Sequence, residues 1–428
     1  MNLSKIKLAG GGERAQYLVH EFNDNTIRFV VNYPGVINPE ILCAATKAVV
    51  ESVDVLHGTF FSDSISAYWH INDNLDPIDY FQYIETEGSP ELTANSLSLS
   101  PIRPDDKAQL RCFLVQNNEA SSIVLNISHL CVDGSDGKYL LSKLVEAYNL
   151  ILKEGSADSL QVKDGSRAPE KVYEKLSIKD LKELLSNPLS SVETPYPFAN
   201  DNPGMPQLIH TIITSEIMSK ARAKAKLVNA TANDILVTAG YHAYASLSQV
   251  NPINAMSVTS MIDLRRHCVN GESEGLCNMS GALPTTLENG VFGTFEETLL
   301  EVSKQTKEVK ENPLAGLEGM PILHGLTRTL PIGLLLMAVG KIYGSMSFGI
   351  TNLGNLKCDE LALGDLVPNG GIFGGPLKKK PGMQVSVISF DGECVLSVVG
   401  QYTKEDNEII QSTLDAMKKE IEKYAEKE

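Results

Sequence analysis

The segment around His129 combines residue types that can move a proton. Asp133 follows His129 at a distance of four residues, and Gly134 comes next. An imidazole has an unperturbed pKa of about 6.5, so it can take a proton from an alcohol, amine or thiol at neutral pH. Asp133 can orient that imidazole, or it can be a buried charge that pairs elsewhere and locks the turn. The alternative interpretation of these residues is a core histidine followed by a simple turn.

The elements on either side of His129 indicate how it is held. Residues 123–127 form a continuous run rich in β-branched residues, which predicts a buried strand that ends just before His129. A turn there holds the imidazole at the edge of a sheet, and Gly134 is expected to adopt backbone angles that a β-carbon would forbid. Residues 137–153 have the apolar spacing of a helix.

The same alternation of strand and helix patterns occupies both halves of the chain. Strands are predicted at residues 26–32, 109–115, 122–128, 207–214, 256–263, 279–286, 346–351, 384–389 and 394–399. Helices are predicted at residues 38–52, 137–153, 215–227 and 233–247, after Thr294 and from about residue 405.

Proline and small polar residues concentrate between residues 154 and 206, which predicts a linker with one short helix at 178–185. We therefore expect an α+β fold (an α/β sandwich) of two similar lobes. Residues 1–170 form the N-terminal lobe with the histidine motif, 171–206 the linker and 207–428 the C-terminal lobe.

Charge and composition exclude several classes of function. The 37 Lys and Arg against 53 Asp and Glu give a formal net charge of −16, which repels nucleic acid and anionic lipid surfaces. The run Lys378-Lys379-Lys380 could still attract an anionic cofactor locally. The seven widely spaced cysteines are expected to be reduced thiols, with no metal site. The longest apolar stretch, residues 330–340, is too short for a membrane span, so we expect a cytoplasmic protein.

Three segments resemble the chloramphenicol-acetyltransferase-like superfamily, which includes condensation domains of peptide synthetases, alcohol acetyltransferases and plant acyltransferases. The run Ser128-His129-Leu130-Cys131-Val132-Asp133-Gly134 resembles its His-His-x-x-x-Asp-Gly signature, with Ser128 in place of the first His. Residues 258–266 resemble the strand whose Arg pairs with the motif Asp, which implies an ion pair between Asp133 and Arg265. Residues 346–354 resemble a strand that faces the active-site channel.

The resemblance implies a set of site residues. His129, Asp133, Gly134 and Asn352 are the expected catalytic residues, with Asn352 polarising a carbonyl or positioning the acceptor. The expected substrate-binding residues are Ser128, Ser347 and Thr351.

The resemblance also implies an activity and a site between the lobes. Donor and acceptor are expected to enter a tunnel there, and His129 deprotonates the acceptor as it attacks a thioester, without an acyl-enzyme. The implied donors are acyl-CoA and the acyl-phosphopantetheine of an acyl carrier protein, and the acceptor is a small alcohol or amine. No permanently bound cofactor is expected, and the protein is expected to be a monomer.

Two other interpretations of the chain belong to different classes. Gly271-Glu272-Ser273-Glu274-Gly275 matches the Gly-x-Ser-x-Gly pattern of serine hydrolases, but here a polar loop runs into a strand and two glutamates flank the serine. A non-catalytic binding or scaffold protein with the same fold is the second. Ser128 in the motif supports it, as does the run at 371–376, which lacks the Asp and Trp of the plant-type Asp-Phe-Gly-Trp-Gly motif. We interpret that run as a bend between strands.

Overall fold

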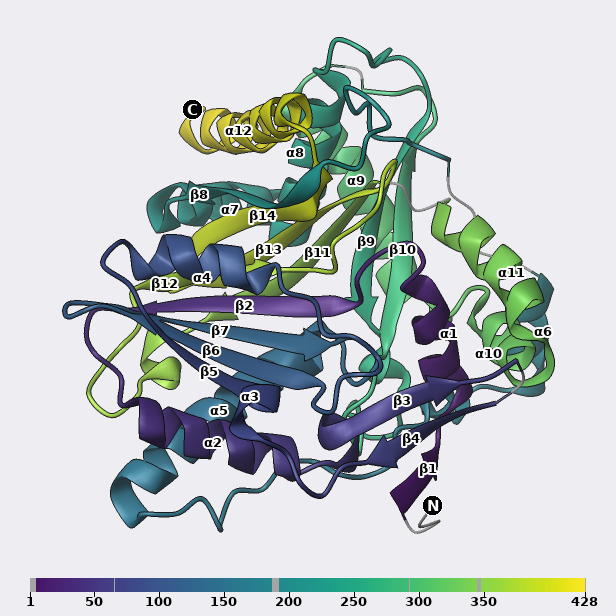
Figure 1. The fold of residues 1–428 in the computed structure, drawn as a ribbon. Helices are drawn as coiled ribbons and strands as arrows, with labels where there is room; N and C mark the ends of the chain where they lie inside the picture. Colours follow the sequence, from purple (N-terminus) through teal and green to yellow (C-terminus); the bar gives the residue numbers. More distant parts are fainter. Residues whose placement is uncertain (1–4, 65, 187–191, 292, 345–347, 428) are drawn as a thin grey trace.

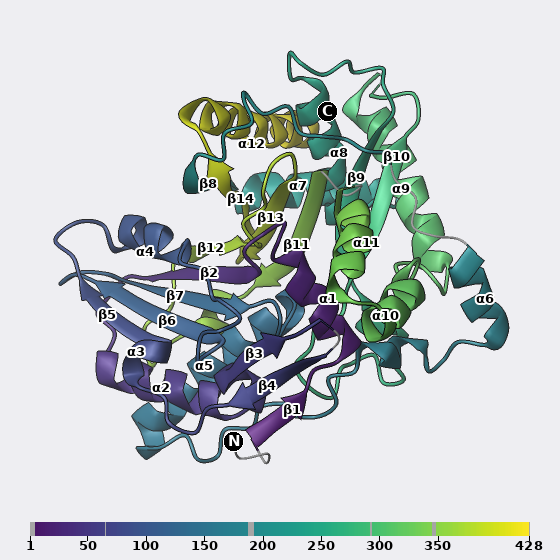
Figure 2. The ribbon, with the colours of Figure 1, turned by 45° about the vertical axis from the view of Figure 1, so that its right-hand side comes forward.

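The protein has a mixed α/β fold of two lobes, which confirms the predicted fold class (Figure 1). The computed structural model describes residues 5–64, 66–186, 192–291, 293–344 and 348–427. Figure 2 shows helix α1 (Gly11–Val19) on the side where the two lobes face each other.

A five-stranded sheet forms the first lobe in the order β12-β2-β7-β6-β5. Its strands are β12 (Gly370–Gly374), β2 (Thr26–Tyr33), β7 (Ser121–Ser128), β6 (Leu110–Gln116) and β5 (Phe81–Glu85). Three further helices of this lobe are α2 (Pro39–Glu51), α3 (Pro77–Tyr80) and α5 (Gly134–Glu154). Helix α4 (Pro90–Ser98) packs on β7, β6 and β2. Because elements cover both faces of the sheet, every residue of β7 is buried.

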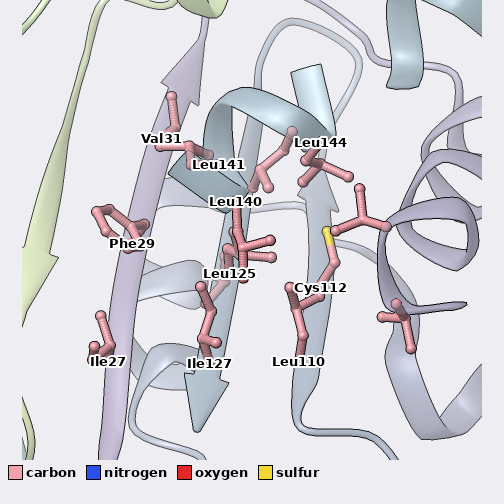
Figure 3. Packing of buried hydrophobic residues seen from close by; sticks show 14 of the residues in the cluster. Ile27, Phe29, Val31, Leu110, Cys112, Leu125, Ile127, Leu140, Leu141 and Leu144 are labelled. Carbon is pink, nitrogen blue, oxygen red and sulfur yellow. The ribbon is translucent and has the colours of Figure 1, made fainter. Parts of the chain in front are cut away.

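The layer between this sheet and α5 is the apolar core beneath the histidine motif. Figure 3 shows alternate side chains of the three central strands and the inner face of α5 meeting there. The residues of this layer that the figure labels are Ile27, Phe29, Val31, Leu110, Cys112, Leu125, Ile127, Leu140, Leu141 and Leu144. Burying this surface fixes where β7 ends and α5 begins.

A six-stranded sheet forms the second lobe in the order β10-β9-β11-β13-β14-β8. Its strands are β10 (Ser280–Leu287), β9 (Met256–Asp263), β11 (Phe348–Leu356), β13 (Met383–Phe390), β14 (Glu393–Tyr402) and β8 (Met205–Ile213). Its helices are α7 (Ser215–Leu227), α8 (Ala232–Ala245), α9 (Phe295–Glu311) and α12 (Lys404–Glu426). The core of this lobe lies between the sheet and these helices.

A smaller three-stranded sheet lies beside the first lobe, with strands β1 (Ile6–Leu8), β4 (Ala67–Ile71) and β3 (Gly58–Ser62) in that order. Helix α1 packs against α10 (Met320–Thr329) and α11 (Ile332–Gly344) through a small apolar cluster. The apolar stretch at 330–340 is thus largely helical. No described helix combines the length and the apolar character needed to cross a bilayer.

Most predicted elements are present at nearly the predicted bounds, and the short helix of the linker is α6 (Ile178–Ser186). The bend predicted at 371–376 is wrong, because Gly370–Gly374 is strand β12 and pairs antiparallel with β2. A segment from the C-terminal part of the chain therefore completes the sheet of the first lobe. The predicted strand at 346–351 begins outside the described residues, and β11 extends it to Leu356.

Candidate active site

His129 is the first residue after strand β7, and its backbone is held on both sides. Its N–H donates to the carbonyl oxygen of Asn25 at 2.7 Å, next to the last paired residues of β2 and β7. The N–H of Cys131 then donates to the carbonyl of Ser128 at 3.0 Å, which closes a turn. The strand end and this turn fix the imidazole in a single place.

One hydrogen bond of the His129 ring favours the tautomer that a general base requires. Nδ1 lies 2.7 Å from the carbonyl oxygen of Val132, and a carbonyl oxygen can only accept. This contact favours the tautomer with the proton on Nδ1, in which the lone pair of Nε2 is the proton acceptor. Burial lowers the pKa of His129, and the charge of Asp133 opposes this only in part. A neutral ring that remains partly exposed is the form that a general base requires.

Asp133 does not orient this ring, because both of its carboxylate oxygens have other partners. Oδ1 accepts from the N–H of Asp136 at 3.0 Å and so caps helix α5. Oδ2 accepts from Arg265 Nη1 at 2.7 Å and from the N–H of Met279 at 2.8 Å. Of the two roles open to Asp133, the structure thus favours the buried charge that locks the turn.

Arg265 is the centre of a buried polar cluster between the two lobes. It follows strand β9 and reaches the start of α5, where its Nη2 lies 2.9 Å from Asp136 Oδ2. Nη1 also lies 3.0 Å from Asp263 Oδ1. Burial alone lowers the pKa of Arg265, but the charges of Asp133 and Asp136 outweigh it and raise the pKa above its usual value. The histidine turn of one lobe is therefore ion-paired to a strand end of the other.

Gly134 packs closely against β11 and does not have unusual backbone angles. It is the first residue of α5 and is absent from the residues with positive φ, which corrects the expectation from the sequence. A β-carbon added at Gly134 would lie 2.5 Å from Cδ2 of Leu353 on β11. Lys138 Nζ also donates to the carbonyl of Leu353 at 3.1 Å. The first turns of α5 and strand β11 therefore lie in direct contact.

Asn352 precedes Leu353 on β11 and lies at the irregularity of that strand's pairing with β13. Its Oδ1 accepts from the N–H of Gly354 at 2.9 Å, so the amide nitrogen remains as the donor. Thr351, also partly exposed, pairs with Ser386 of β13. Ser347 lies outside the described residues.

Ser128 differs from the other candidates because it is only 1% exposed. It is the last residue of β7, and its N–H donates to the carbonyl of Gln109 at 2.8 Å. The structure therefore gives Ser128 a place in the core beneath the histidine turn rather than at an open surface.

Arg167 is a positioning residue that the sequence did not reveal. Its guanidinium donates to the carbonyls of Cys131 at 3.1 Å and Leu130 at 3.3 Å, both in the histidine turn. It also pairs with Glu13 of α1, at 2.7 Å between Nη2 and Oε1. A lone arginine in a proline-rich linker carries no sequence signal for such contacts.

A second missed contact reaches the ring itself. Asn278 Nδ2 lies 3.0 Å from His129 Nδ1 and donates to Gln16 Oε1 of α1 at 3.1 Å. Neither residue belongs to a recognisable motif, and no sequence signal links them to His129, which is 149 residues from Asn278 along the chain.

Two other sequence candidates are committed to structural contacts. Ser273 is 6% exposed, and its Oγ accepts from Arg265 Nε at 3.0 Å and from Lys163 Nζ at 3.1 Å, so no histidine activates it in the structure. Lys378 is buried, which lowers its pKa to about 8, while Lys380 pairs with Asp406 at 2.5 Å. Lys379 donates to the carbonyl of Glu21 at 2.6 Å. The three lysines therefore do not act as one cationic cluster.

The predicted tunnel stays a prediction. Two surface hollows in the structure lie away from His129, one beside α2 and the end of α5, the other between α8 and α9. Within the described part of the chain, no group of three or more His, Cys, Asp or Glu side chains could hold a metal ion.

No family model matches this chain, and neither does any curated protein. Solved structures do resemble it. Polyketide synthase associated protein 5 from Mycobacterium tuberculosis is 13% identical, with 98% of each chain covered and a TM-score of 0.69. A trichothecene 15-O-acetyltransferase from Fusarium sporotrichioides is 13% identical over 96% of this chain and 94% of that chain, with a TM-score of 0.70. The first condensation domain of the calcium-dependent antibiotic synthetase is 13% identical over 99% and 98%, with a TM-score of 0.67. At these identities the likeness shows the fold.

Proposed function

We propose that this chain, which has the chloramphenicol-acetyltransferase-like fold, is an acyltransferase that moves an acyl group from a thioester to an alcohol or amine. The donor is an acyl-CoA or an acyl-phosphopantetheine on a carrier protein. Structural neighbours named as an acetyltransferase and as a condensation domain support acyl transfer as the class of reaction. The site chemistry of this chain supports the histidine as its base.

The observation that carries the proposal is the contact between His129 Nδ1 and the carbonyl of Val132 at 2.7 Å. It favours the tautomer with the proton on Nδ1, in which Nε2 is an acceptor, and burial favours the neutral ring by lowering its pKa. The backbone of the turn is fixed by β7 on one side and by the capped start of α5 on the other. A base held this rigidly loses little entropy when the acceptor binds.

The reaction transfers the acyl group once and a proton twice, first onto His129 and then off it. Nε2 of His129 takes the proton of the acceptor O–H or N–H as the oxygen or nitrogen attacks the thioester carbonyl. The new C–O or C–N bond forms and the C–S bond breaks. The imidazolium then returns its Nε2 proton to the leaving thiolate, so that the ring ends neutral and the chain carries no acyl group.

Asn352 is the candidate residue to stabilise the negative charge that develops on the thioester carbonyl oxygen. Its amide nitrogen is a neutral donor on β11. The next residue of that strand, Leu353, contacts the start of α5. Donors of this kind stabilise a tetrahedral oxyanion when they are fixed in advance. Thr351 and Ser347 remain proposed substrate-binding residues. Ser128, which is buried at the end of β7, supports the histidine turn from the core.

The test is a thiol-release assay with the full chain. Acyl-CoA donors of increasing chain length are combined with alcohol and amine acceptors, and a parallel arm uses an acyl-phosphopantetheine donor. We expect release that depends on both donor and acceptor, and a rate about 10²–10⁴ lower for His129→Ala. His70→Ala is the matched control, since His70 is a partly exposed histidine on β4, and it should retain the wild-type rate.

Two results would contradict the proposal. Full turnover by His129→Ala would remove the histidine as the base. A folded wild-type chain that binds donors or acceptors but releases no thiol in either arm would favour the non-catalytic binding protein of the same fold.

A further inference from the structure

The ring nitrogen Nδ1 of His129 has two partners of opposite character. The carbonyl oxygen of Val132, at 2.7 Å, can only accept a hydrogen bond. The amide nitrogen of Asn278, at 3.0 Å, can only donate one. A nitrogen with a single in-plane position cannot satisfy both partners in the same protonation state.

The orientation of the Asn278 amide is fixed from both ends by backbone groups. At one end, Oδ1 of Asn278 accepts from the backbone N–H of Ser280 at 3.1 Å. At the other, Asn25 Nδ2 donates to the carbonyl of Gln16 at 2.6 Å, so Asn25 Oδ1 accepts from Gln16 Nε2 at 2.7 Å. Gln16 Oε1 is then left to accept from Asn278 Nδ2 at 3.1 Å. Flipping Asn278 would break the contacts at both of its atoms, so its N–H groups face His129.

We propose that Asn278 is a positioning residue that disfavours the charged form of His129 and supports a second neutral tautomer, with the proton on Nε2. In the imidazolium both ring nitrogens carry a proton, so the Nδ1–H always meets an N–H of Asn278. The neutral ring escapes this opposition when its proton moves to Nε2, because Nδ1 then accepts from Asn278. The imidazolium has no tautomer that removes the opposition between the two N–H groups.

Other charges act on the ring from the elements around it. Asp133, at the start of α5, and Asp24, just before β2, favour the charged ring, while burial opposes it. Both carboxylates are paired with buried arginines, Asp133 with Arg265 and Asp24 with Arg28. Asn278 and Gln16 are neutral groups, so they act on the ring through hydrogen-bond direction rather than net charge.

The effect of Asn278 on catalysis rests on the proposed acyl-transfer function, whereas its effect on the protonation of His129 does not. A base must be neutral before it can take the acceptor proton. Asn278 opposes an Nδ1–H in the imidazolium and in the neutral ring alike, so it extends the neutral range of His129 to lower pH by supporting the Nε2–H tautomer. The proton of that tautomer must move to Nδ1 before Nε2 can take the acceptor proton.

The experiment measures protonation directly, with or without turnover. The full chain is labelled with ¹⁵N in its histidine rings, and the Nδ1 and Nε2 shifts are followed from about pH 5 to about pH 8. The signal that disappears in His129→Gln is assigned to His129. The variants are Asn278→Asp, which replaces the donor by an acceptor of the same shape, and Asn278→Leu, which removes the donor alone. Asn118→Asp adds the same charge at an exposed turn and is the control.

We expect the pKa of His129 to rise by about one unit or more in Asn278→Asp, by less in Asn278→Leu, and not at all in Asn118→Asp. The Nε2–H tautomer should be detectable in the wild-type chain and absent from both Asn278 variants. The acid limb of the pH–rate profile should move to higher pH in Asn278→Asp by the same amount.

The proposal is overturned if the wild-type ring carries its proton on Nδ1 alone, a result that needs no variant to fold. It is equally overturned if the His129 pKa is the same in the wild-type chain and the Asn278 variants. If the shifts occur but no thioester supports turnover, the acyl-transfer proposal fails and the role of Asn278 in protonation stands.

Discussion

Arg265 and Asp133 form an ion pair that joins the two lobes, with 2.7 Å between Nη1 and Oδ2. Both residues are almost fully buried, and each has further partners, so no charge of the pair is left uncompensated. The pair fixes the turn that begins with His129 against the strand end that carries Arg265. Removing Asp133 takes one acceptor from Arg265, which keeps Asp136 and Asp263, and takes the acceptor of the Met279 N–H.

Replacing Asp133 by alanine should therefore destabilise the protein by about 2–4 kcal/mol, because α5 loses its cap and Arg265 loses one of its three carboxylate partners. Urea unfolding followed by circular dichroism measures the change. The control is Lys220→Gln, which breaks an exposed ion pair with Glu216 and should leave the unfolding transition where it is. Equal urea midpoints for Asp133→Ala and the wild-type chain would show that the pair does not hold the turn.

The pH dependence of stability should carry a contribution from His129. Burial lowers its pKa in the folded protein below the value of about 6.5 in the unfolded chain. As the pH falls, the unfolded chain therefore binds the proton first, and the folded state loses stability. The contribution is fully present above about pH 6.5 and is lost as the pH falls towards the folded-state pKa.

His129→Asn removes this titration, so the variant should lose less unfolding free energy than the wild-type chain between about pH 8 and about pH 5. The comparison is necessary because burial also lowers the pKa of His210, His242 and His267, which titrate in both proteins. Identical pH dependence in the two proteins would mean that His129 is not desolvated.

Local patterns predicted the elements that hold the histidine. A run rich in β-branched residues predicted β7, and the spacing of Leu140, Leu141 and Leu144 predicted α5. Each pattern arises from residues that are near one another in the sequence. The start of the helix predicted at 38–52 is local in the same sense, because the side chain of Asn38 caps α2 by accepting from the N–H groups of Glu40 and Ile41.

Long-range polar contacts could not be predicted in this way. Asn278 and Gln16 meet only after the two lobes pack, and an isolated amide has no periodicity that would mark it. Strand β12 was missed because its hydrogen-bond partners belong to β2, more than three hundred residues earlier. From local sequence alone a glycine-rich segment is interpreted as a bend, because the distant strand that pairs with it cannot be recognised from its neighbours.

The contact between Gly134 and Leu353 should appear as an energetic coupling. Gly134→Ala brings a β-carbon against Cδ2 of Leu353, the end of a flexible and half-buried side chain, and should destabilise the protein by at most about 1 kcal/mol. Leu353→Ala removes the obstructing atom, so the double variant should be more stable than the sum of the single effects, by about 0.5–1 kcal/mol. A double-mutant cycle by urea unfolding measures this coupling, and strict additivity would contradict the close approach.

Ser273 should not react with a fluorophosphonate probe. Its Oγ is buried and accepts from Arg265 and Lys163, so nothing in its contacts withdraws its proton. We expect no labelling of the folded chain by mass spectrometry, with a serine hydrolase in the same tube as the positive control. Labelling of Ser273 that disappears in Ser273→Ala would revive the hydrolase interpretation.

Asn352→Asp tests whether an amide donor on β11 acts on the carbonyl of the donor substrate. The aspartate retains the oxygen that accepts from Gly354 N–H but replaces the Nδ2 donor by an acceptor, so it should oppose a developing oxyanion. We expect kcat to fall by about 10²–10³, with a smaller change in KM, because the lost interaction forms only in the transition state. Asn355→Asp is the matched control: Asn355 lies three residues later on the same strand, and its Oδ1 also accepts from a glycine N–H, that of Gly392 at 2.8 Å. Both variants add one negative charge to β11, so an equal loss in the two would assign the effect to charge on the strand, whereas a loss confined to Asn352→Asp would assign it to the donor at that position.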